Sequence, residues 1–316
     1  MLRRSFLKSV LSAPASSLLL RTGSLGLAQA LPVGPTLPKA SPNDFDFVFF
    51  TDCHIEPELS AVAGSARCFA QINSENADFC IAGGDQVFDV CQQDLTRAHM
   101  LFKLYRQTEK ELHGKIYYTI GNHDVVGINQ QSPVEPGDLE YGKKLYEDYF
   151  GKRYYSFDYK SWHFVVLDSI GIEYYKIFKA RFDQPQLDWL KADLAAVGPT
   201  RPVIVVTHVP IATVLGSLSR RQPEDVGPIA DNSYAVHALL ANCNLKAILQ
   251  GHLHVWQKSE YRGVQYLISG AISGAWWEGP MHGTPEGYTV CRVRGGEIHL
   301  NYVTYPWTAA VQHNNG

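Results

Sequence analysis

Five short groups of metal-binding residue types recur along the chain, each directly after a short apolar run. In chain order they are Asp52-Cys53-His54, Gly84-Asp85, Gly121-Asn122-His123-Asp124, Thr207-His208 and Gly251-His252-Leu253-His254. Carboxylate, imidazole and amide side chains suit Zn, Fe or Mn. Because ligand sites in open α/β sheets gather beyond the carboxyl ends of the strands, the order of these groups predicts one shared metal site.

The groups differ in how much each one indicates alone. A chain of this composition contains roughly 0.6 Asp-x-His pairs and roughly 0.5 His-x-His pairs by chance, so neither is informative by itself. Gly-Asn-His-Asp arises by chance only roughly 0.002 times, and the ordered set of five is rarer still. The alternative is that each group is a turn with a locally satisfied polar side chain. The complete set favours the metal site.

Alternating strands and helices are expected to position these groups. Apolar runs predict strands at 45–50, 78–81, 115–120, 203–207 and 247–249, each ending at one of the groups. Helical spacing predicts helices around 61–74, 94–112, 186–196 and 234–241. Further strands are expected at 154–159, 162–168 and 264–269, and Gly295-Gly296 predicts a hairpin between 288–293 and 298–303. Strands that alternate with helices and later give way to hairpins predict mixed sheets covered by helices.

The ordered set resembles that of the calcineurin-like metallophosphoesterase superfamily, over roughly residues 45–305. The segment Tyr155–Asp158 followed by Leu167-Asp168-Ser169 also looks like the central hairpin of that superfamily. Ser269-Gly270 with Ser273–Trp277 is similar to bacterial members related to cyclic-nucleotide phosphodiesterases. The resemblance implies an α/β fold, a four-layer α/β/β/α sandwich with two mixed β-sheets, for a domain at 44–306.

The resemblance also implies a centre of two divalent ions, Mn, Fe or Zn. The first ion would take Asp52, His54, Asp85 and His254. The second ion would take Asp85, Asn122, His208 and His252, so Asp85 would bridge the two. A hydroxide held between the ions is the expected nucleophile, because bound metals lower the pKa of water.

Two residues beside the ligands are expected to serve catalysis, and three more to line the substrate site. His123 resembles the superfamily's histidine that protonates the leaving oxygen or stabilises the transition-state phosphate. Asp124 is expected to hold the other nitrogen of that imidazole, with a solvated loop carboxylate as the alternative. Trp276, Trp277 and His282 are expected to border the substrate, although ordinary packing is an equal alternative for the tryptophans.

These features predict hydrolysis of a phosphoester by the metal-held hydroxide. A phosphodiester, possibly a cyclic nucleotide, is favoured because no Arg or Lys in the motif loops stands next to a ligand to pair with the second charge of a monoester. A phosphomonoesterase is the enzymatic alternative; it would not be purple, since Phe88 replaces the tyrosine that purple acid phosphatases carry. The remaining alternatives are a non-catalytic scaffold with the same fold and a nuclease.

The first thirty residues predict export. Arg3-Arg4 before Phe6-Leu7-Lys8, and the later Ala28-Gln29-Ala30, resemble a twin-arginine signal peptide with its cleavage site at 1–30. A periplasmic or secreted location and an encounter with the twin-arginine export machinery are therefore expected; a basic, frayed N-terminus is the alternative. Residues 31–43 are expected to be a linker and 307–316 a C-terminal tail.

Composition excludes several classes of protein and of partner. Removing 1–30 leaves 24 of 28 basic residues against 31 acidic ones, so the net charge falls from -3 to -7 and binding to a nucleic acid duplex is disfavoured. No run reaches the roughly 18 apolar residues of a membrane span. The six cysteines include no Cys-x-x-Cys pair, and no disulfide framework is expected. The expected partner is a small phosphoester substrate; the oligomeric state is not indicated.

Overall fold

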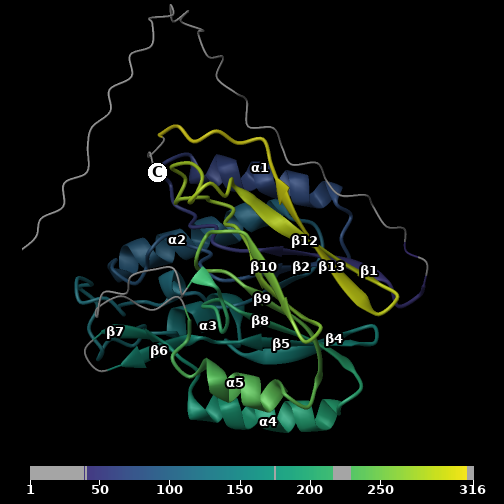
Figure 1. Ribbon diagram of the computed structural model, residues 1–316. Coiled ribbons are helices and arrows are strands. Elements are labelled where there is room, and N and C mark those ends of the chain that lie inside the picture. The colour runs from purple at the N-terminus through teal and green to yellow at the C-terminus, as the bar shows by residue number, and fades with distance from the viewer. Residues whose placement is uncertain (1–38, 40, 174–175, 216–228, 312–316) are drawn as a thin grey trace, which may run out of the picture.

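The computed structural model describes residues 39, 41–173, 176–215 and 229–311. The predicted signal peptide at 1–30, most of the predicted linker and the end of the predicted tail lie outside this part of the chain. Within it, two large sheets pack face to face between helices (Figure 1). No helix of the described residues combines the length and the apolar character needed to cross a bilayer.

The first sheet has five strands in the order β13-β12-β1-β2-β3. Its members are β1 (Phe45–Phe50), β2 (Phe79–Ala82), β3 (Ile116–Tyr118), β12 (Gly287–Arg294) and β13 (Glu297–Thr304). The strands β1, β2 and β3 run parallel, whereas β12 pairs antiparallel with both β1 and β13. Arg294 faces Glu297 across the predicted Gly295-Gly296 turn, whose glycines both have positive φ, so the hairpin expected there is confirmed.

The second sheet has six strands in the order β10-β11-β9-β8-β5-β4. They are β4 (Tyr155–Tyr159), β5 (Trp162–Leu167), β8 (Pro202–Thr207), β9 (Asn244–Gln250), β10 (Gln257–Tyr261) and β11 (Val264–Ile268). The central strands β5, β8, β9 and β11 are parallel, and an antiparallel strand closes each edge. A separate pair, β6 (Ile170–Glu173) with β7 (Ile177–Ala180), was not expected from the sequence.

Helices cover the outer faces of both sheets. In Figure 1, α1 (Ala61–Ser74) and α2 (Leu95–Thr108) lie on the side of the first sheet, and α4 (Gln184–Val197) and α5 (Ser233–Leu240) lie on the side of the second. Asp94 caps α2 by accepting the backbone N–H of Arg97, and Asp183 caps α4 by accepting that of Gln186. A short helix α3 (Lys144–Phe150) and two 3-10 turns, Glu109–Glu111 and Asn122–Asp124, complete the elements.

Alternation along β1 shows how the layers are held together. Successive side chains of a strand point to opposite faces of the sheet. Phe45, Phe47 and Phe49 belong to the buried cluster between the two sheets, where the ring of Phe47 meets that of Phe164 edge-on at 5.5 Å. Phe50 instead packs towards α1, with its ring 5.7 Å from that of Phe69. The four-layer α/β/β/α sandwich with two mixed sheets is thus confirmed.

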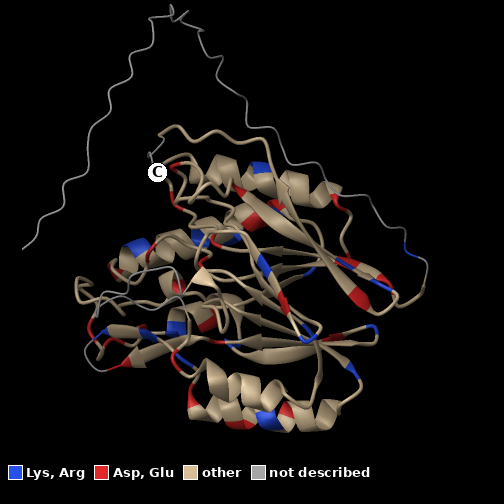
Figure 2. Cartoon of the chain, viewed as in Figure 1, with Lys and Arg blue, Asp and Glu red and all other residues tan. Residues whose placement is uncertain are grey.

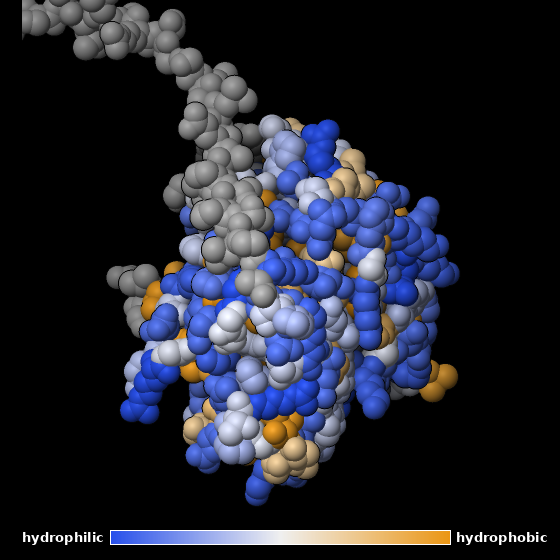
Figure 3. All heavy atoms as spheres, turned by 90° about the vertical axis from the view of Figure 1, so that its right-hand side faces the viewer, coloured by the Kyte–Doolittle hydropathy of each residue, from blue (hydrophilic) through white to orange (hydrophobic). Residues whose placement is uncertain are grey.

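The surface carries both signs of charge and little clustered apolar area. Figure 2 shows lysines and arginines interspersed with aspartates and glutamates over the helices and strands of the described chain. On the face drawn in Figure 3, hydrophobic residues form small separate areas among hydrophilic ones. Scattered surface apolar residues of this kind are ordinary for globular proteins.

Candidate metal centre

All five predicted groups lie in loops that leave the carboxyl ends of parallel strands. Asp52 follows β1, Asp85 follows β2, Asn122 follows β3, His208 follows β8, and the His252–His254 group follows β9. The first three strands belong to one sheet and the last two to the other. The loops of the two sheets therefore meet over the same end of the sandwich, as the position of ligand sites in α/β sheets predicts.

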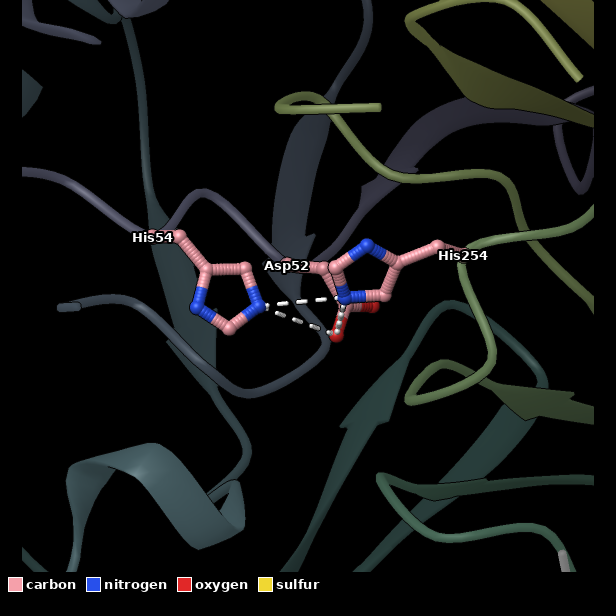
Figure 4. A group of neighbouring side chains, drawn as sticks. All are labelled: Asp52, His54 and His254. Carbon is pink, nitrogen blue, oxygen red and sulfur yellow. Dashed lines mark hydrogen bonds and ion pairs between the residues drawn. The ribbon is translucent and has the colours of Figure 1, made fainter. Parts of the chain in front are cut away.

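The first set of ligand atoms comes from Asp52, His54 and His254 (Figure 4). His254 Nε2 lies 3.2 Å from Asp52 Oδ1, and His54 Nε2 lies 3.1 Å from His254 Nε2 and 3.8 Å from the same carboxylate oxygen. All three side chains are buried. Three ligand atoms that converge within 4.8 Å of one another fit a single divalent ion.

A second set comes from Asp85, His208 and His252. Asp85 Oδ2 lies 3.1 Å from His208 Nε2 and 3.7 Å from His54 Nε2, so one oxygen atom stands between the two sets. The other oxygen, Oδ1, accepts the backbone N–H of His123 at 2.8 Å, which fixes the orientation of the carboxylate. This is the arrangement expected of a bridging ligand, the role predicted for Asp85.

Backbone carbonyl groups select the ligand nitrogen of two histidines. His208 Nδ1 lies 2.9 Å from the carbonyl oxygen of Gly83, and His254 Nδ1 lies 2.6 Å from that of Gly274. A carbonyl oxygen can only accept, so Nδ1 carries the proton in both rings and Nε2 keeps its lone pair for a metal. In both cases Nε2 is the atom that points towards the carboxylates.

Several buried polar atoms of the site have no hydrogen-bond partner within the described chain. They are Asp52 Oδ1, Asn122 Oδ1 and His208 Nε2, together with Nδ1 of His54 and Nδ1 of His123; all but the last belong to predicted ligands. Buried polar groups are nearly always satisfied, and such orphaned atoms therefore call for a missing partner. The residues present fit two divalent ions, because every orphaned atom is a good ligand for Mn, Fe or Zn.

The charge states of the histidines agree with this assignment. Burial lowers the pKa of His252 to about 3 and that of His54 well below its ordinary value, so both rings are neutral and able to bind a metal. Burial also lowers the pKa of His208, but the nearby carboxylates of Asp85 and Asp52 outweigh it and raise the pKa to about 9. This excess of negative potential is what a divalent cation would neutralise.

The ligand loops are held in backbone conformations that most residues avoid. Asp52, His54, Asp85, His252 and His254 all have φ between 42° and 73°, the left-handed region. Such residues persist only where the surrounding structure fixes them, and they concentrate at functional sites. The strain therefore marks the same residues that the motifs indicate.

Gly121 shows why the third group needs a glycine. A Cβ atom at this position would lie 2.1 Å from Asp85 Oδ1 and 2.2 Å from the backbone nitrogen of Asp85. No side chain fits there without displacing the bridging carboxylate. The glycine thus allows the Asn122 loop to approach Asp85 closely.

His123 lies next to the ligands but is oriented by a different carboxylate from the one expected. Its ring meets that of His54 edge-on at 4.8 Å, and its Nδ1 lies 3.5 Å from Asp89 Oδ1. Burial lowers the pKa of His123, but the carboxylates of Asp85 and Asp89 outweigh this and raise it above the ordinary value. The side chain of His123 is 22% exposed, so its ring can be reached from solvent.

The expectation that Asp124 holds the His123 imidazole is wrong. Asp124 is fully buried and turns towards the loop after β2, where Oδ1 accepts the backbone N–H groups of Gln86 and Val87. Its Oδ2 accepts the N–H of Gly121. Asp124 therefore fixes two ligand loops to each other. The residue that faces His123 is Asp89, four positions after Asp85, which sequence reasoning missed.

The three residues expected to border the substrate separate in the structure. Trp277 is fully buried, and its indole N–H is donated to the carbonyl oxygens of Cys53 and His54 at 3.1 Å each, so it is a packing residue and the substrate role is corrected. Trp276 is 37% exposed, with its ring 4.7 Å from that of His254, and it stays a candidate. His282 is exposed, and its role stays a prediction.

Comparisons with known proteins agree with the fold and the motifs. A family model described as calcineurin-like phosphoesterase matches residues 45–256. A dimetal phosphatase from Danio rerio superposes with a TM-score of 0.58 at 15% identity, over 82% of this chain and 96% of that one. GAP50, an anchor in the inner membrane complex of Plasmodium, gives 0.54 at 17% identity, over 85% and 88%.

A purple acid phosphatase from yellow lupin (Lupinus luteus) seeds also gives a TM-score of 0.54, at 14% identity, over 84% of this chain and 52% of that one. At these identities the three structures establish the fold alone. No curated protein matched the chain. The family model covers most of the chain and includes every predicted ligand. The chain belongs to the calcineurin-like phosphoesterase family.

Proposed function

We propose that this phosphoesterase hydrolyses phosphodiesters, cyclic nucleotides among them, with two divalent ions of Mn, Fe or Zn. The observation that carries the proposal is the position of Asp85 Oδ2, which faces a histidine of each ligand set. The residues of the two sets would hold two ions, which would supply charge stabilisation to the attacking and leaving oxygens of an in-line displacement.

The ligand residues hold and orient the ions, which when bound supply Lewis acidity and activate water. His123 donates a proton to the leaving alcohol from its exposed edge. Asp89 faces Nδ1 of that ring and favours its protonated form. Asp124 keeps the loops of Asp85 and His123 in a fixed relation by accepting three backbone N–H groups.

A preference for diesters is supported by the absence of extra cations. Within the described chain, the ion pairs of Asp52 and Asp85 all involve histidines. A monoester dianion would gain a charge-assisted bond from each added Arg or Lys, whereas a diester carries one negative charge. The sequence candidates for such a role, Arg220 and Arg221, lie outside the described residues. Trp276 offers an aromatic wall to the leaving group.

A phosphomonoesterase is the second candidate, and the dimetal phosphatase and purple acid phosphatase among the similar structures are the reason to keep it. A scaffold without activity is a third, since GAP50 is described as an anchor. The complete donor set, with orphaned ligand atoms aimed at one another, favours catalysis over that third candidate.

A kinetic panel with matched nitrophenyl diester and monoester substrates and defined metals tests the proposal. We expect the higher kcat/KM for the diester. His123→Ala should lower kcat by roughly 10²–10⁴-fold and keep the two ions of the centre. His99→Ala is the matched control, because His99 pairs with Glu140 away from the ligands. A monoester preference of about tenfold, which is about 1.4 kcal/mol, would contradict the diester proposal.

We further propose that the chain is exported through the twin-arginine route to the periplasm or beyond. The support is the Arg3-Arg4 motif and the Ala28-Gln29-Ala30 site. Replacing Arg3 and Arg4 by lysine should leave the precursor in the cytoplasm, because lysine lacks the guanidinium geometry that a receptor reads. An immunoblot of cell fractions measures the processing. Unchanged processing of the double variant would contradict export by this route.

A further inference from the structure

Another group of metal-binding side chains lies beside the two-ion centre. It uses none of the seven predicted ligands, although His123 also lies within 4.8 Å of ligand atoms of His54 and Asp85. The group consists of Asp89, Cys91 and His123, whose ligand atoms all lie within 4.8 Å of one another. Cys91 Sγ donates a hydrogen bond to Asp89 Oδ1 at 2.7 Å, and the same oxygen lies 3.5 Å from His123 Nδ1. The thiol, carboxylate and imidazole are therefore already gathered around one point.

The backbone holds this group together. The N–H of Val90 donates to the carbonyl oxygen of His123 at 3.0 Å, and the N–H of Gln92 donates to that of Asp89 at 3.3 Å. Asp89 itself has a φ of 50°, the left-handed conformation seen at the ligands of the two-ion centre. The Asp89 loop and the His123 loop are thus fixed to each other.

The group is reachable from solvent. The side chain of His123 is 22% exposed and that of Asp89 is 12% exposed, while Cys91 is 8% exposed. An ion can therefore approach along the edge of the imidazole. Cys91 itself is buried at the edge of the core, as are the other cysteines of the described chain except Cys243, which is half-buried beside α5.

The donor set and its spacing fit zinc. Zinc prefers four tetrahedral ligands that include thiolate sulfur and imidazole nitrogen, at about 2.0–2.3 Å. Ligand atoms around such an ion lie about 3.3–3.7 Å apart. The 3.5 Å between His123 Nδ1 and Asp89 Oδ1 already fits this geometry, and the 2.7 Å between Cys91 Sγ and Asp89 Oδ1 would have to lengthen by about 0.6–1 Å. Three protein ligands would leave the fourth position to water.

We propose that Asp89, Cys91 and His123 form a third metal site, which binds zinc and inhibits the enzyme. Binding forms Zn–S, Zn–O and Zn–N bonds and releases the thiol proton, and the Nδ1 proton where it is present, to solvent. Zinc then occupies Nδ1 of His123, so the ring can no longer carry N–H on both nitrogens, which is its proton-donating form. Inhibition rests on the proposed function; occupancy of the site does not.

Cobalt titration separates the third site from the two-ion centre, because the ligands of that centre include no thiolate. We expect metal-free full-length protein to bind three equivalents of Co²⁺ and to show a near-ultraviolet sulfur-to-cobalt charge-transfer band. Cys91→Ser should bind two equivalents and show no such band. Cys243→Ser, the matched control, should retain both the third equivalent and the band.

Activity on the nitrophenyl diester completes the test. Excess Zn²⁺ should lower the activity of the wild type and of Cys243→Ser by roughly 10²-fold, which is what loss of a general acid costs. The activity of Cys91→Ser should fall by less than about twofold, compared with the same variant without excess zinc. Absence of the band in the wild type, its persistence in Cys91→Ser, or equal inhibition of both proteins would overturn the proposal. A band in a protein inactive on every substrate would refute the proposed function and leave the third site standing.

Discussion

Trp277 links the core to the metal loop, and replacing it by phenylalanine tests that link. Its indole N–H is shared between the carbonyl oxygens of Cys53 and of the predicted ligand His54. Its ring packs so closely on α1 that a Cβ at Gly64 would lie 2.2 Å from it. Trp277→Phe keeps an aromatic ring at this position but removes the donor.

The expected loss of stability comes from two sources. Leaving buried carbonyl groups without their donor costs about 1–3 kcal/mol, and the smaller ring leaves a cavity worth about 1 kcal/mol. For a domain of this size 1 kcal/mol corresponds to about 2–4 °C, so a loss of about 2–4 kcal/mol should lower Tm by about 4–16 °C. Because the freed carbonyls belong to the loop of His54, affinity for the first ion should fall by about 10–100-fold.

Thermal unfolding, metal titration and kinetics on a small and a bulky diester check this prediction. Since Trp277 has no exposed surface, the ratio of kcat/KM for the two diesters at saturating metal should equal that of the wild type. Trp307→Phe is the control, because Trp307 packs against Trp277 at 5.6 Å but donates no hydrogen bond to the metal loop. A changed ratio with an unchanged Tm would show that Trp277 contacts substrate and would refute the reasoning.

Three further substitutions probe the loops around the centre. Asp89→Asn removes a negative charge 3.5 Å from His123, and that charge is worth about 1.2 kcal/mol even in bulk water. The pKa of His123 should therefore fall, and the alkaline decrease of kcat/KM should move to lower pH by about one unit. An alkaline decrease at unchanged pH would exclude His123 as the acid. Asp124→Ala leaves three buried N–H groups without an acceptor, so denaturant unfolding should show at least about 3 kcal/mol less stability. Almost no loss of stability, the result expected for removal of an exposed carboxylate, would contradict this role. Gly121→Ala should displace Asp85 and abolish metal binding at the centre, which metal analysis would show. Full metal content would mean that the loop can move to make room for the added methyl group.

Much of the fold follows from local patterns in the sequence. The strands β1, β2 and β8 were predicted to within a residue at each end, because their hydrophobic runs are short and end at polar groups. The strand β9 begins three residues before its predicted start. The edge strand β10 was missed: its sequence Gln-Lys-Ser-Glu-Tyr has no apolar alternation, and its pairing with β11 is what makes it a strand. The helix α3 was not predicted either, and its first turn has no side-chain cap.

The candidate site was predictable for residues whose type alone determines their role. It was less predictable for residues whose role depends on where the side chain lies in space. Six of the seven predicted ligands gather in two sets of ligand atoms, because each follows a strand whose direction the motif order implies. The seventh, Asn122, lies in a neighbouring loop with its Oδ1 unpaired, and its role stays a prediction. Asp124 was misassigned because its position next to His123 in the sequence does not determine where its side chain points. The 3-10 turn directs the Asp124 carboxylate inward. Asp89 was missed because its approach to His123 depends on a positive φ that the sequence does not reveal.

The metal content of the purified full-length protein tests the central claim most directly. After reconstitution with Mn²⁺, which a thiolate site binds poorly, elemental analysis should find two ions per chain. Asp85→Ala should lose both ions together with the activity, since one oxygen of Asp85 faces both ligand sets. Asp188→Ala is the control, because Asp188 accepts an exposed hydrogen bond from Gln184; this variant should keep both ions. A wild type that binds no metal yet hydrolyses phosphoesters in the presence of strong chelators would contradict the account.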